Sequence, residues 1–184
     1  MLNLFKKLKI LNNDKKLIYH GTNSKVFLLN NGNIKKVFTR KREIKFPIEK
    51  KCLEALSHYD FFPKMISYNK DKFEIEMSFC GENISKANLP INWTDQVHMI
   101  IKILNQMEFV QSDIELHNVC VKDDQIYMID FGSNRFYFDE FFSNQKLQPD
   151  WLAKFDVSPM EKYQIYKNKK HRRLEEIILN LVTR

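Results

Sequence analysis

Short runs of β-branched and aromatic residues dominate the first half of the chain. Polar or glycine-containing segments separate the runs, which is the pattern typical of strands. The runs lie at residues 18–19, 26–29, 34–38, 65–68 and 73–79. The sequence NNGN at residues 30–33 separates the second run from the third and is a strong hairpin-turn signal. We therefore expect an antiparallel sheet in this half.

Two stretches of helical spacing are also visible. The first follows Pro47, and because proline is common in the first turn of a helix we expect Pro47 to open it. Its apolar positions are Ile48, Cys52, Leu53 and Leu56. The second helix is expected to begin at Thr94, whose hydroxyl can cap a helix N-terminus. Its apolar face consists of Val97, Ile100, Ile101, Leu104 and Met107.

The last third of the chain indicates one more strand pair and further helix. Residues 119–121 and 126–129 flank the polar sequence KDDQ and are expected to form a hairpin. Residues 174–182 are expected to form an amphipathic helix. A packed helix is also expected around Trp151, Leu152 and Phe155.

The order of these elements predicts an α+β fold. A sheet with one helix is expected in residues 1–79, a connector near residues 79–82, and a mainly helical part in residues 80–184. The chain has 184 residues, of which 43% are hydrophobic and 13% aromatic. That is enough apolar material for one or two packed cores, so disorder is not expected.

Neither membrane insertion nor secretion is indicated. No run of about 18 apolar residues occurs, and lysines interrupt the apolar pattern of residues 1–17 too early for a signal peptide. Cys52, Cys80 and Cys120 lie far apart without a CxxC pair, which argues against a disulfide framework and a structural zinc site. We expect a cytoplasmic protein with reduced cysteines.

Positive charge is concentrated in the first part of the chain. Residues 1–79 carry 17 Lys and Arg against 8 Asp and Glu, a net +9, whereas residues 80–184 carry 13 against 15, a net −2. This split fits an anion held between the two parts, and it equally fits lysine-rich faces that keep the chain in solution. The basic segments at residues 1–11 and 167–173 allow weak, reversible contact with acidic lipid at a membrane surface, nucleic acid or a protein. For the second segment a solvated helix face is the simpler interpretation.

The clearest chemical signal is the spacing of three polar residues. Asp113 and Asn118 are five positions apart, and the expected hairpin would bring Asp130 close to Asn118. Phosphoryl transfer needs an oriented hydroxyl, cations on the phosphate oxygens and a fixed nucleotide. A carboxylate for the hydroxyl, together with an amide oxygen and a second carboxylate for metal ions, would meet the first two needs.

This arrangement resembles the catalytic loop and the Asp-Phe-Gly segment of the protein kinase-like superfamily. The D-x-x-x-x-N pattern spans residues 113–118, and Asp130 begins the Asp-Phe-Gly sequence. The resemblance implies that Asp113 orients the acceptor hydroxyl, and that Asn118 and Asp130 hold Mg²⁺, or Mn²⁺ in its place. It also implies a two-lobed kinase-like fold in which ATP lies between a small, sheet-containing N-lobe and a reduced, mainly helical C-lobe.

Other parts of the family pattern occur in the same order along the chain. Lys36 matches the strand lysine that holds the α- and β-phosphates, and Glu49 matches its helix partner, while Lys35 and Glu54 remain alternatives. The turn after residue 20 resembles a shortened phosphate-covering loop, and residues 77–81 resemble the hinge that meets adenine. The nucleotide-binding residues implied in these two segments are Gly21, Thr22, Asn23, Ser24, Val26, Met77 and Phe79.

The chain departs from the pattern of most protein kinases at several positions. Gln111 and Ser112 stand where many of them carry His-Arg, and Glu115 stands where they carry a lysine near the γ-phosphate. No Ala-Pro-Glu follows Asp130, and the 52 residues after Gly132 are too few for a full peptide-binding subdomain. The compact pattern looks closer to the RIO-type, KEOPS-complex and lipopolysaccharide or aminoglycoside kinase-like branches.

Two further residues receive expectations from this comparison. Asp156 is expected to support the catalytic loop, as a helix aspartate does in similar kinases. His117 has no partner at ligand spacing, so a packing or substrate-side position is expected rather than a metal ligand.

The resulting prediction is an ATP- and Mg²⁺-dependent phosphotransferase that acts on a hydroxyl of a protein serine or threonine or of a sugar. The first alternative is a pseudokinase, because Glu115 adds negative charge where the phosphates would lie. The second is a basic nucleic-acid-binding protein, for which the net +9 of residues 1–79 is the only support.

Overall fold

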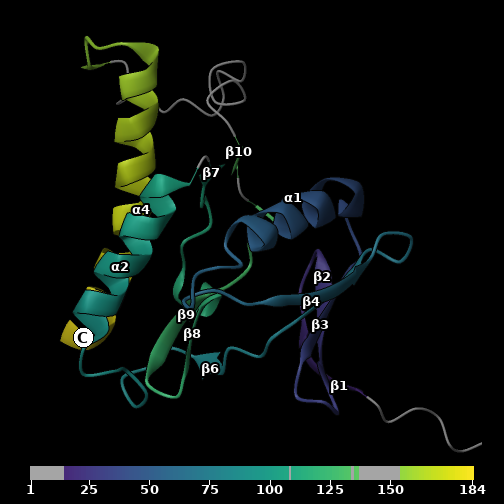
Figure 1. Ribbon diagram of the computed structural model, residues 1–184. Helices are drawn as coiled ribbons and strands as arrows, with labels where there is room; N and C mark the ends of the chain where they lie inside the picture. The colour runs from purple at the N-terminus through teal and green to yellow at the C-terminus, as the bar shows by residue number, and fades with distance from the viewer. Residues whose placement is uncertain (1–14, 108, 134, 137–153) are drawn as a thin grey trace, which may run out of the picture.

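The computed structural model describes residues 15–107, 109–133, 135–136 and 154–184, and it has an α+β fold. Figure 1 shows the strands that begin the described chain together with α1 at one side of the molecule. The long helix α4 runs beside α2 at the other side, with the β8–β9 hairpin between the two sides. The basic segment at residues 1–11, and Trp151 and Leu152, lie outside the described residues.

A five-stranded antiparallel sheet forms the first part of the fold, in the order β1-β2-β3-β5-β4. Its strands are β1 (Lys15–His20), β2 (Ser24–Leu29), β3 (Ile34–Phe38), β4 (Met65–Asn69) and β5 (Glu74–Met77). All five overlap the runs that the sequence pattern predicted, although β5 is shorter than expected. The turn between β2 and β3 uses Gly32 at φ 81°, a left-handed conformation that glycine adopts without steric cost.

Helix α1 (Arg42–Ala55) covers one face of this sheet through its buried residues. Phe46 packs edge-to-face on Phe38 and on Phe73, with ring centroids 5.8 and 5.7 Å apart. The expectation that Pro47 opens the helix is wrong, because α1 begins at Arg42 and Pro47 lies inside it. Packing of Phe46 against the sheet accounts for the helical turn that precedes the proline.

Helix α2 (Trp93–Gln106) begins before Thr94, so the expectation that the Thr94 hydroxyl caps its N-terminus is wrong, and Thr94 lies inside the first turn. Its N-cap position is Asn92, whose Oδ1 accepts a hydrogen bond from Gln96 Nε2 at 2.7 Å instead of capping a backbone N–H. The same Gln96 accepts a bond from the backbone N–H of Ile126 at 2.7 Å. Gln96 therefore ties the start of α2 to the β8–β9 hairpin.

Short strands connect these helices to the centre of the molecule. β6 (Glu82–Asn83) pairs with β8 (Val119–Lys122), which pairs with β9 (Gln125–Met128) as the expected hairpin. Both turn residues, Asp123 and Asp124, have positive φ angles, 51° and 58°, as a tight two-residue hairpin turn requires. The 3₁₀ turn η1 (Leu116–Asn118) leads into β8, and β7 (Phe109–Val110) pairs with β10 (Arg135–Phe136).

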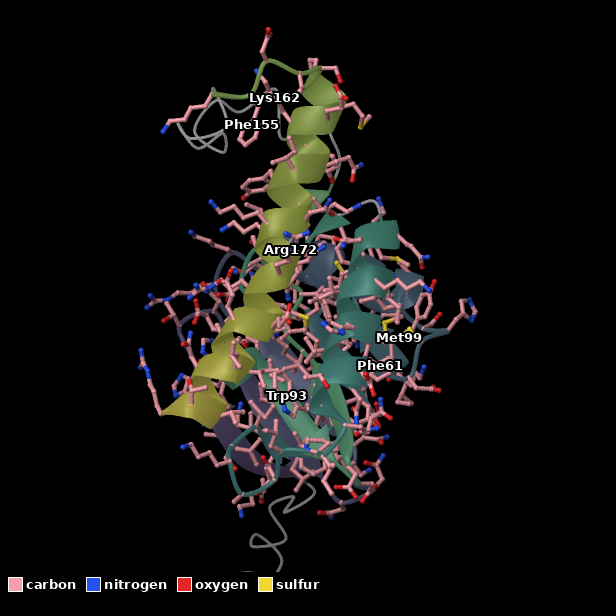
Figure 2. The ribbon with its side chains drawn as sticks, turned by 90° about the vertical axis from the view of Figure 1, so that its left-hand side faces the viewer. Phe61, Trp93, Met99, Phe155, Lys162 and Arg172 are labelled. Atoms are coloured by element: carbon pink, nitrogen blue, oxygen red, sulfur yellow. The ribbon has the colours of Figure 1, made fainter. Side chains whose placement is uncertain are left out.

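Helix α4 (Pro159–Thr183) is much longer than the expected helix at residues 174–182. Ser158 and Glu161 form a reciprocal capping box that fixes its start. The basic run at residues 167–173 therefore lies inside α4, and it is not simply a solvated face, because Lys167 and His171 are buried. Figure 2 shows α4 lying alongside α2, with the labelled Phe155 and Lys162 at the end of α4 that extends past α2.

The expectations for Phe155 and Asp156 are also corrected. Phe155 is 40% exposed and precedes α4 rather than packing inside a helix. Asp156 is exposed and lies in the segment before α4 rather than in a helix, so only its expected place in a helix is wrong, and its support of the catalytic loop stays a prediction.

A single hydrophobic cluster joins the sheet, the three α-helices of the described residues and the β8–β9 hairpin. Members that are fully buried include Leu53, Ile75, Leu104, Ile126 and Ile178, one from each of these parts. None of the helices in the described ranges is long and apolar enough to cross a membrane.

Candidate functional site

A cavity of about 400 Å³ lies between the five-stranded sheet and the segment that carries η1 and the β8–β9 hairpin. This is within the size range of small-molecule sites in proteins. All twelve site residues expected from the sequence line this cavity. They are Gly21, Thr22, Asn23, Ser24, Val26, Lys36, Glu49, Met77, Phe79, Asp113, Asn118 and Asp130.

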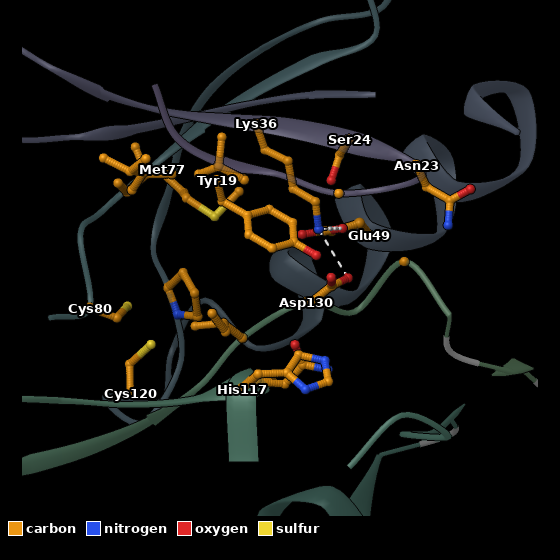
Figure 3. Close-up of a pocket in the computed structure, with 18 of the residues that line it drawn as sticks. Tyr19, Asn23, Ser24, Lys36, Glu49, Met77, Cys80, His117, Cys120 and Asp130 are labelled. Carbon is orange, nitrogen blue, oxygen red and sulfur yellow. Dashed lines mark hydrogen bonds and ion pairs between the residues drawn. The ribbon is translucent and has the colours of Figure 1, made fainter. Parts of the chain in front are cut away.

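Lys36 forms the centre of the charged end of the cavity (Figure 3). Its Nζ donates to Glu49 Oε2 at 2.6 Å and lies 3.0 Å from Asp130 Oδ1. The lysine comes from β3, Glu49 from α1 and Asp130 from the segment after β9. One ammonium group therefore holds together three elements that are distant in the sequence.

The pKa values of the trio reflect this crowding. Burial alone would lower the pKa of Lys36, but the charges of Glu49 and Asp130 more than offset it, so the pKa is raised and the lysine stays charged. Burial raises the pKa of Glu49 to about 7, against the opposing attraction of Lys36. For Asp130, burial is outweighed by Lys36 and the pKa is lowered. Two carboxylates share the one ammonium group of Lys36. The attraction of Lys36 outweighs the cost of burial for Asp130 but not for Glu49.

The structure distinguishes the residue pair Lys36 and Glu49 from the alternatives that the sequence left open, Lys35 and Glu54. Lys35, on the opposite face of β3 from Lys36, pairs with Glu74 at 3.8 Å on the surface. Glu54 pairs with Lys50 at 2.6 Å on the outer side of α1. The structure therefore places Lys36 and Glu49 in the cavity, and neither alternative lines it.

Asp113 and Asn118 belong to a loop that is closed on itself. Asn118 Nδ2 donates to the backbone oxygen of Asp113 at 3.0 Å. This bond brings together the two ends of the five-residue spacing seen in the sequence. The backbone oxygen of Asn118 accepts from the N–H of Ile129 at 2.9 Å. Because Ile129 precedes Asp130 directly, this bond brings Asn118 next to the Asp-Phe-Gly segment.

Gln111 links the same two segments from the other side. Its Nε2 donates to the backbone oxygen of Asp130 at 3.1 Å, and its Oε1 accepts from the N–H of Asp113 at 3.5 Å. The residue is fully buried. Gln111 thus connects the backbone of Asp113 with that of Asp130.

The backbone at Asp130 has an unusual conformation. Its φ angle is 59°, in the left-handed region that non-glycine residues rarely occupy, and such residues gather at functional sites. The next residue, Phe131, is fully buried against Phe62 and Phe109. Anchoring of Phe131 in the core accounts for a conformation that turns the Asp130 carboxylate back into the cavity.

Neither protein-family models nor curated protein sequences match this chain.

The donor set at the charged end of the cavity is suited to a hard divalent cation. Because Nδ2 of Asn118 donates to Asp113, Oδ1 of the same amide remains as an oxygen ligand for a cation on the cavity wall. Asp130 supplies a carboxylate and Asp113 a second one. Among the described residues no group of three or more His, Cys, Asp or Glu side chains is close enough to hold a metal alone. A cation here would therefore need oxygens from its ligand, which is how Mg²⁺ binds with nucleotides.

The opposite end of the cavity is mostly apolar. It is lined by Ile18, Met77, Phe79 and the cysteines Cys80 and Cys120, whose side chains lie near each other and point into the cavity in Figure 3. Gly81 adopts φ 87°, and a Cβ there would lie 2.0 Å from the backbone oxygen of Val121. The backbone at position 81 can therefore approach β8 this closely only when the residue is glycine.

Tyr19 was not expected from the sequence and stands at the middle of the cavity. Figure 3 shows its ring extending into the space between Met77 and the Lys36 trio. A Cβ on Gly21 would lie 2.5 Å from that ring, so the glycine leaves the room that Tyr19 occupies. A ligand that spans both ends of the cavity would have to move this side chain.

Glu115 does not line the cavity, contrary to the expectation that it adds negative charge where phosphates would lie. Its Oε1 accepts from Arg173 Nη2 at 3.2 Å, on the surface between η1 and α4. His117 does line the cavity, with an exposed side chain, and its backbone oxygen accepts from Asn83 Nδ2 at 2.7 Å.

Lys45 and Ser133 also line the cavity and were missed by sequence reasoning. Lys45 precedes Glu49 by four residues in α1, so the helical repeat places both on the same face, and this spacing was a usable signal. For Ser133, which directly follows Gly132, and for Tyr19, no comparable signal exists in the sequence.

Proposed function

We propose that this chain is a phosphotransferase that binds ATP with Mg²⁺ in the cavity and transfers the γ-phosphate to a hydroxyl acceptor. The observation that carries the proposal is the contact of Lys36 with both Glu49 and Asp130, in one cavity with Asp113 and Asn118. A lysine that served only to neutralise a buried glutamate would not need a second carboxylate. The excess negative charge fits a site that is completed by a divalent cation and its anionic ligand.

Each residue has a defined part in this proposal. Asp113 accepts a hydrogen bond from the acceptor hydroxyl and orients it for attack. Lys36, held by Glu49, binds the α- and β-phosphates, and the turn from Gly21 to Ser24 covers them. The apolar end around Met77 takes the base.

Asn118 and Asp130 would hold the metal through Oδ1 of the amide and the carboxylate. Bound Mg²⁺ neutralises charge on the phosphate oxygens, which is the chemistry that these side chains cannot supply alone. Asp130 already contacts Lys36 at 3.0 Å, so its carboxylate would serve both the strand lysine and a bound cation.

The proposal includes a two-lobed, kinase-like arrangement of the chain. The five-stranded sheet and α1 precede residue 80, and the hairpin, α2 and α4 follow it. The cavity is lined from both of these parts, with Met77 to Gly81 between them. This order of elements supports residues 1–79 as an N-lobe and residues 80–184 as a reduced C-lobe.

A pseudokinase that binds nucleotide without turnover is the second candidate. The observation that favours it is Tyr19, whose ring extends into the cavity beside Lys36 (Figure 3). The position of Glu115 no longer supports this candidate, because Arg173 pairs with it outside the cavity.

Binding and transfer are tested separately. Isothermal titration with Mg²⁺-ATP measures binding, and γ-³²P transfer to water, to the protein itself, to serine- and threonine-containing peptides and to sugars measures turnover. Three variants are compared with the unmodified protein: Asp113→Asn, Asp130→Asn and, as a matched control in the β8–β9 turn, Asp123→Asn.

We expect Asp113→Asn to bind Mg²⁺-ATP and lose transfer, and Asp130→Asn to lose metal-dependent binding as well, while Asp123→Asn changes neither. Binding by the unmodified protein without transfer to any acceptor would favour the pseudokinase. Absence of binding would overturn both nucleotide-site candidates.

A further inference from the structure

Lys45 is the second positive charge of the cavity. Among the described residues that line it, only Lys36 and Lys45 carry a full positive charge, against the carboxylates of Glu49, Asp113 and Asp130. Lys36 is engaged by two of these carboxylates. Lys45 forms no ion pair within the described residues, and its Nζ donates to the neutral hydroxyl of Ser133 at 2.8 Å. Lys45 lies near enough to Glu49 and Asp130 to lower the pKa of both, but no carboxylate holds its ammonium in a direct contact, so that ammonium can turn to an anionic ligand.

The contacts of Ser133 place Lys45 at the Asp113 end of the cavity. The backbone oxygen of Ser133 accepts a short hydrogen bond from the hydroxyl of Ser112, the residue directly before Asp113. Lys45, Ser133 and Ser112 thus form a chain of contacts from α1 to the loop that carries Asp113. The apolar end, around Met77 and Cys80, is lined by other elements.

Close packing fixes the turn of α1 that carries Lys45. A Cβ on Gly132 would lie 3.6 Å from both the Cβ and the backbone oxygen of Lys45, and 3.1 Å from Glu49 Oε2. The side chain of Lys45 therefore starts directly above the Asp-Phe-Gly segment. It is only half-buried, so its ammonium can exchange the serine hydroxyl for a stronger acceptor.

We propose that Lys45 binds the terminal phosphate of the nucleoside triphosphate, as a phosphate-binding residue supplied by α1 instead of the loop after Asp113. This inference rests on the proposed function and assigns a residue to the γ-phosphate. In the loop itself the corresponding place is taken by Glu115, which faces away from the cavity toward Arg173. The terminal phosphate then lies between Lys45 and Asp113.

The test compares the affinities of Mg²⁺-ATP and Mg²⁺-ADP, because only ATP carries the terminal phosphate. Loss of a charge-assisted hydrogen bond weakens binding by about ten-fold or more. We expect Lys45→Met to weaken ATP binding by that factor and to leave ADP binding within about two-fold. The control is Lys50→Met in the same helix, where Lys50 pairs with Glu54, lies over the Tyr68 ring and does not line the cavity; it should change neither affinity.

Two further variants separate phosphate binding from a structural role. Lys45→Arg keeps the charge and should retain the preference for ATP over ADP. Ser133→Ala removes the partner that Lys45 has in the described structure and should leave that preference intact or increase it. Both variants are conservative, so they remain informative if Lys45→Met is poorly folded.

Three results would overturn the assignment. Equal weakening of ATP and ADP by Lys45→Met would show a structural role, and unchanged affinities would show that Lys45 does not contact the nucleotide. Loss of ATP preference in Ser133→Ala would show that Lys45 acts only by positioning Ser133. If the unmodified protein binds neither nucleotide, the proposed function itself fails, which is a distinct outcome.

Discussion

His171 Nε2 accepts a hydrogen bond from the backbone N–H of Gln111 at 3.3 Å, and its Nδ1 lies 2.7 Å from Asn105 Oδ1. Because Nε2 is the acceptor, Nδ1 carries the proton and donates to Asn105. Helix α4 thereby holds the strand end that leads into the Asp113 loop, using a histidine from a run of basic residues. Four residues before Gln111, the backbone oxygen of Met107 accepts a hydrogen bond from Lys167 Nζ at 2.6 Å, which is a second contact of α4 with this segment.

The first prediction concerns the pH dependence of stability. Burial lowers the pKa of His171 to about 3, with a further lowering from Lys167, whereas an unfolded histidine titrates near 6.5. The unfolded state therefore takes up the proton first on acidification. The free energy of unfolding should fall between about pH 6.5 and 3 by up to about 1.4 kcal/mol per pH unit from this group.

Urea unfolding at several pH values tests this contribution. His171→Gln keeps an acceptor for Gln111 and a donor for Asn105, and it should lose stability less steeply with acid than the unmodified protein. His98→Gln serves as the control, because His98 is 62% exposed in its side chain. Equal slopes for His171→Gln and the unmodified protein would contradict a buried, neutral histidine.

The second prediction concerns Lys36. Replacement by methionine leaves Glu49 buried without its cation, a change that typically costs about 3 kcal/mol or more while the carboxylate is ionised. Glu49 already has a pKa raised to about 7, and it rises further without Lys36, so protonation removes the cost at low pH. Lys36→Met should therefore be close to the unmodified protein in stability at pH 5 and clearly less stable at pH 8.

Chemical denaturation at both pH values measures this difference. Adding Glu49→Gln to Lys36→Met should restore much of the stability at pH 8, because no buried charge remains at position 49. Lys35→Met, on the surface face of the same strand, should cost less than about 0.5 kcal/mol. A cost for Lys36→Met that does not depend on pH would argue against Glu49 as its origin.

The third prediction compares two glycines with similar backbone angles. Gly32 and Gly81 have φ angles of 81° and 87°, but a Cβ on Gly32 would meet nothing within 4 Å, whereas one on Gly81 would collide with Val121. Gly32→Ala should cost about 1 kcal/mol from backbone strain alone. Gly81→Ala should cost about 3 kcal/mol or more, since β8 must shift, and it should weaken nucleotide binding. Melting temperatures that fall equally would show that the contact with β8 relaxes freely.

The fourth prediction concerns the cysteines of the cavity. Burial raises the pKa of Cys80 to about 12, with a further increase from Cys120, and raises that of Cys120 to about 11. Only the thiolate is nucleophilic, so at pH 8 both should react with iodoacetamide at least about 100-fold more slowly than free cysteine. Mass spectrometry of the labelled peptides measures these rates.

Nucleotide provides the control for the cysteine experiment. Mg²⁺-ATP should slow labelling of Cys80 and Cys120 further, because both line the cavity. Cys52 is fully buried elsewhere, and its labelling should not depend on a bound ligand except through overall stability. Protection of Cys52 alone would indicate that the nucleotide binds outside the cavity.

The strands were predictable from local alternation and turn residues, and the cavity residues from motifs that resemble those of the protein kinase-like superfamily. Alternation in β3 separates Lys36 from Lys35, and the hairpin between Asn118 and Asp130 follows from its turn residues. The motif spacing then identified residues that line one cavity, whereas their chemical roles stay predictions.

The errors arise where tertiary contacts outweigh local preference. Pro47 suggested a helix start, but packing of Phe46 on the sheet adds a turn before it. The charges at residues 167–173 suggested a solvated face, but carbonyl and amide partners on other segments satisfy Lys167 and His171 in the interior. Such partners cannot be read from a sequence without the fold.

The proline inside α1 has a consequence for local opening of the structure. Pro47 has no N–H to donate to the preceding turn, and the N-cap residue Lys41 has a left-handed backbone without a side-chain cap. The turn that carries Lys45 thus has fewer backbone hydrogen bonds than the rest of the helix, and it depends more on its packing against Gly132 and on buried Phe46. Its amides should exchange with deuterium through a local unfolding that leaves Glu49 and the core protected. Any ligand that binds Lys45 would then slow exchange in this one helical turn, even where the rest of the molecule gives no response.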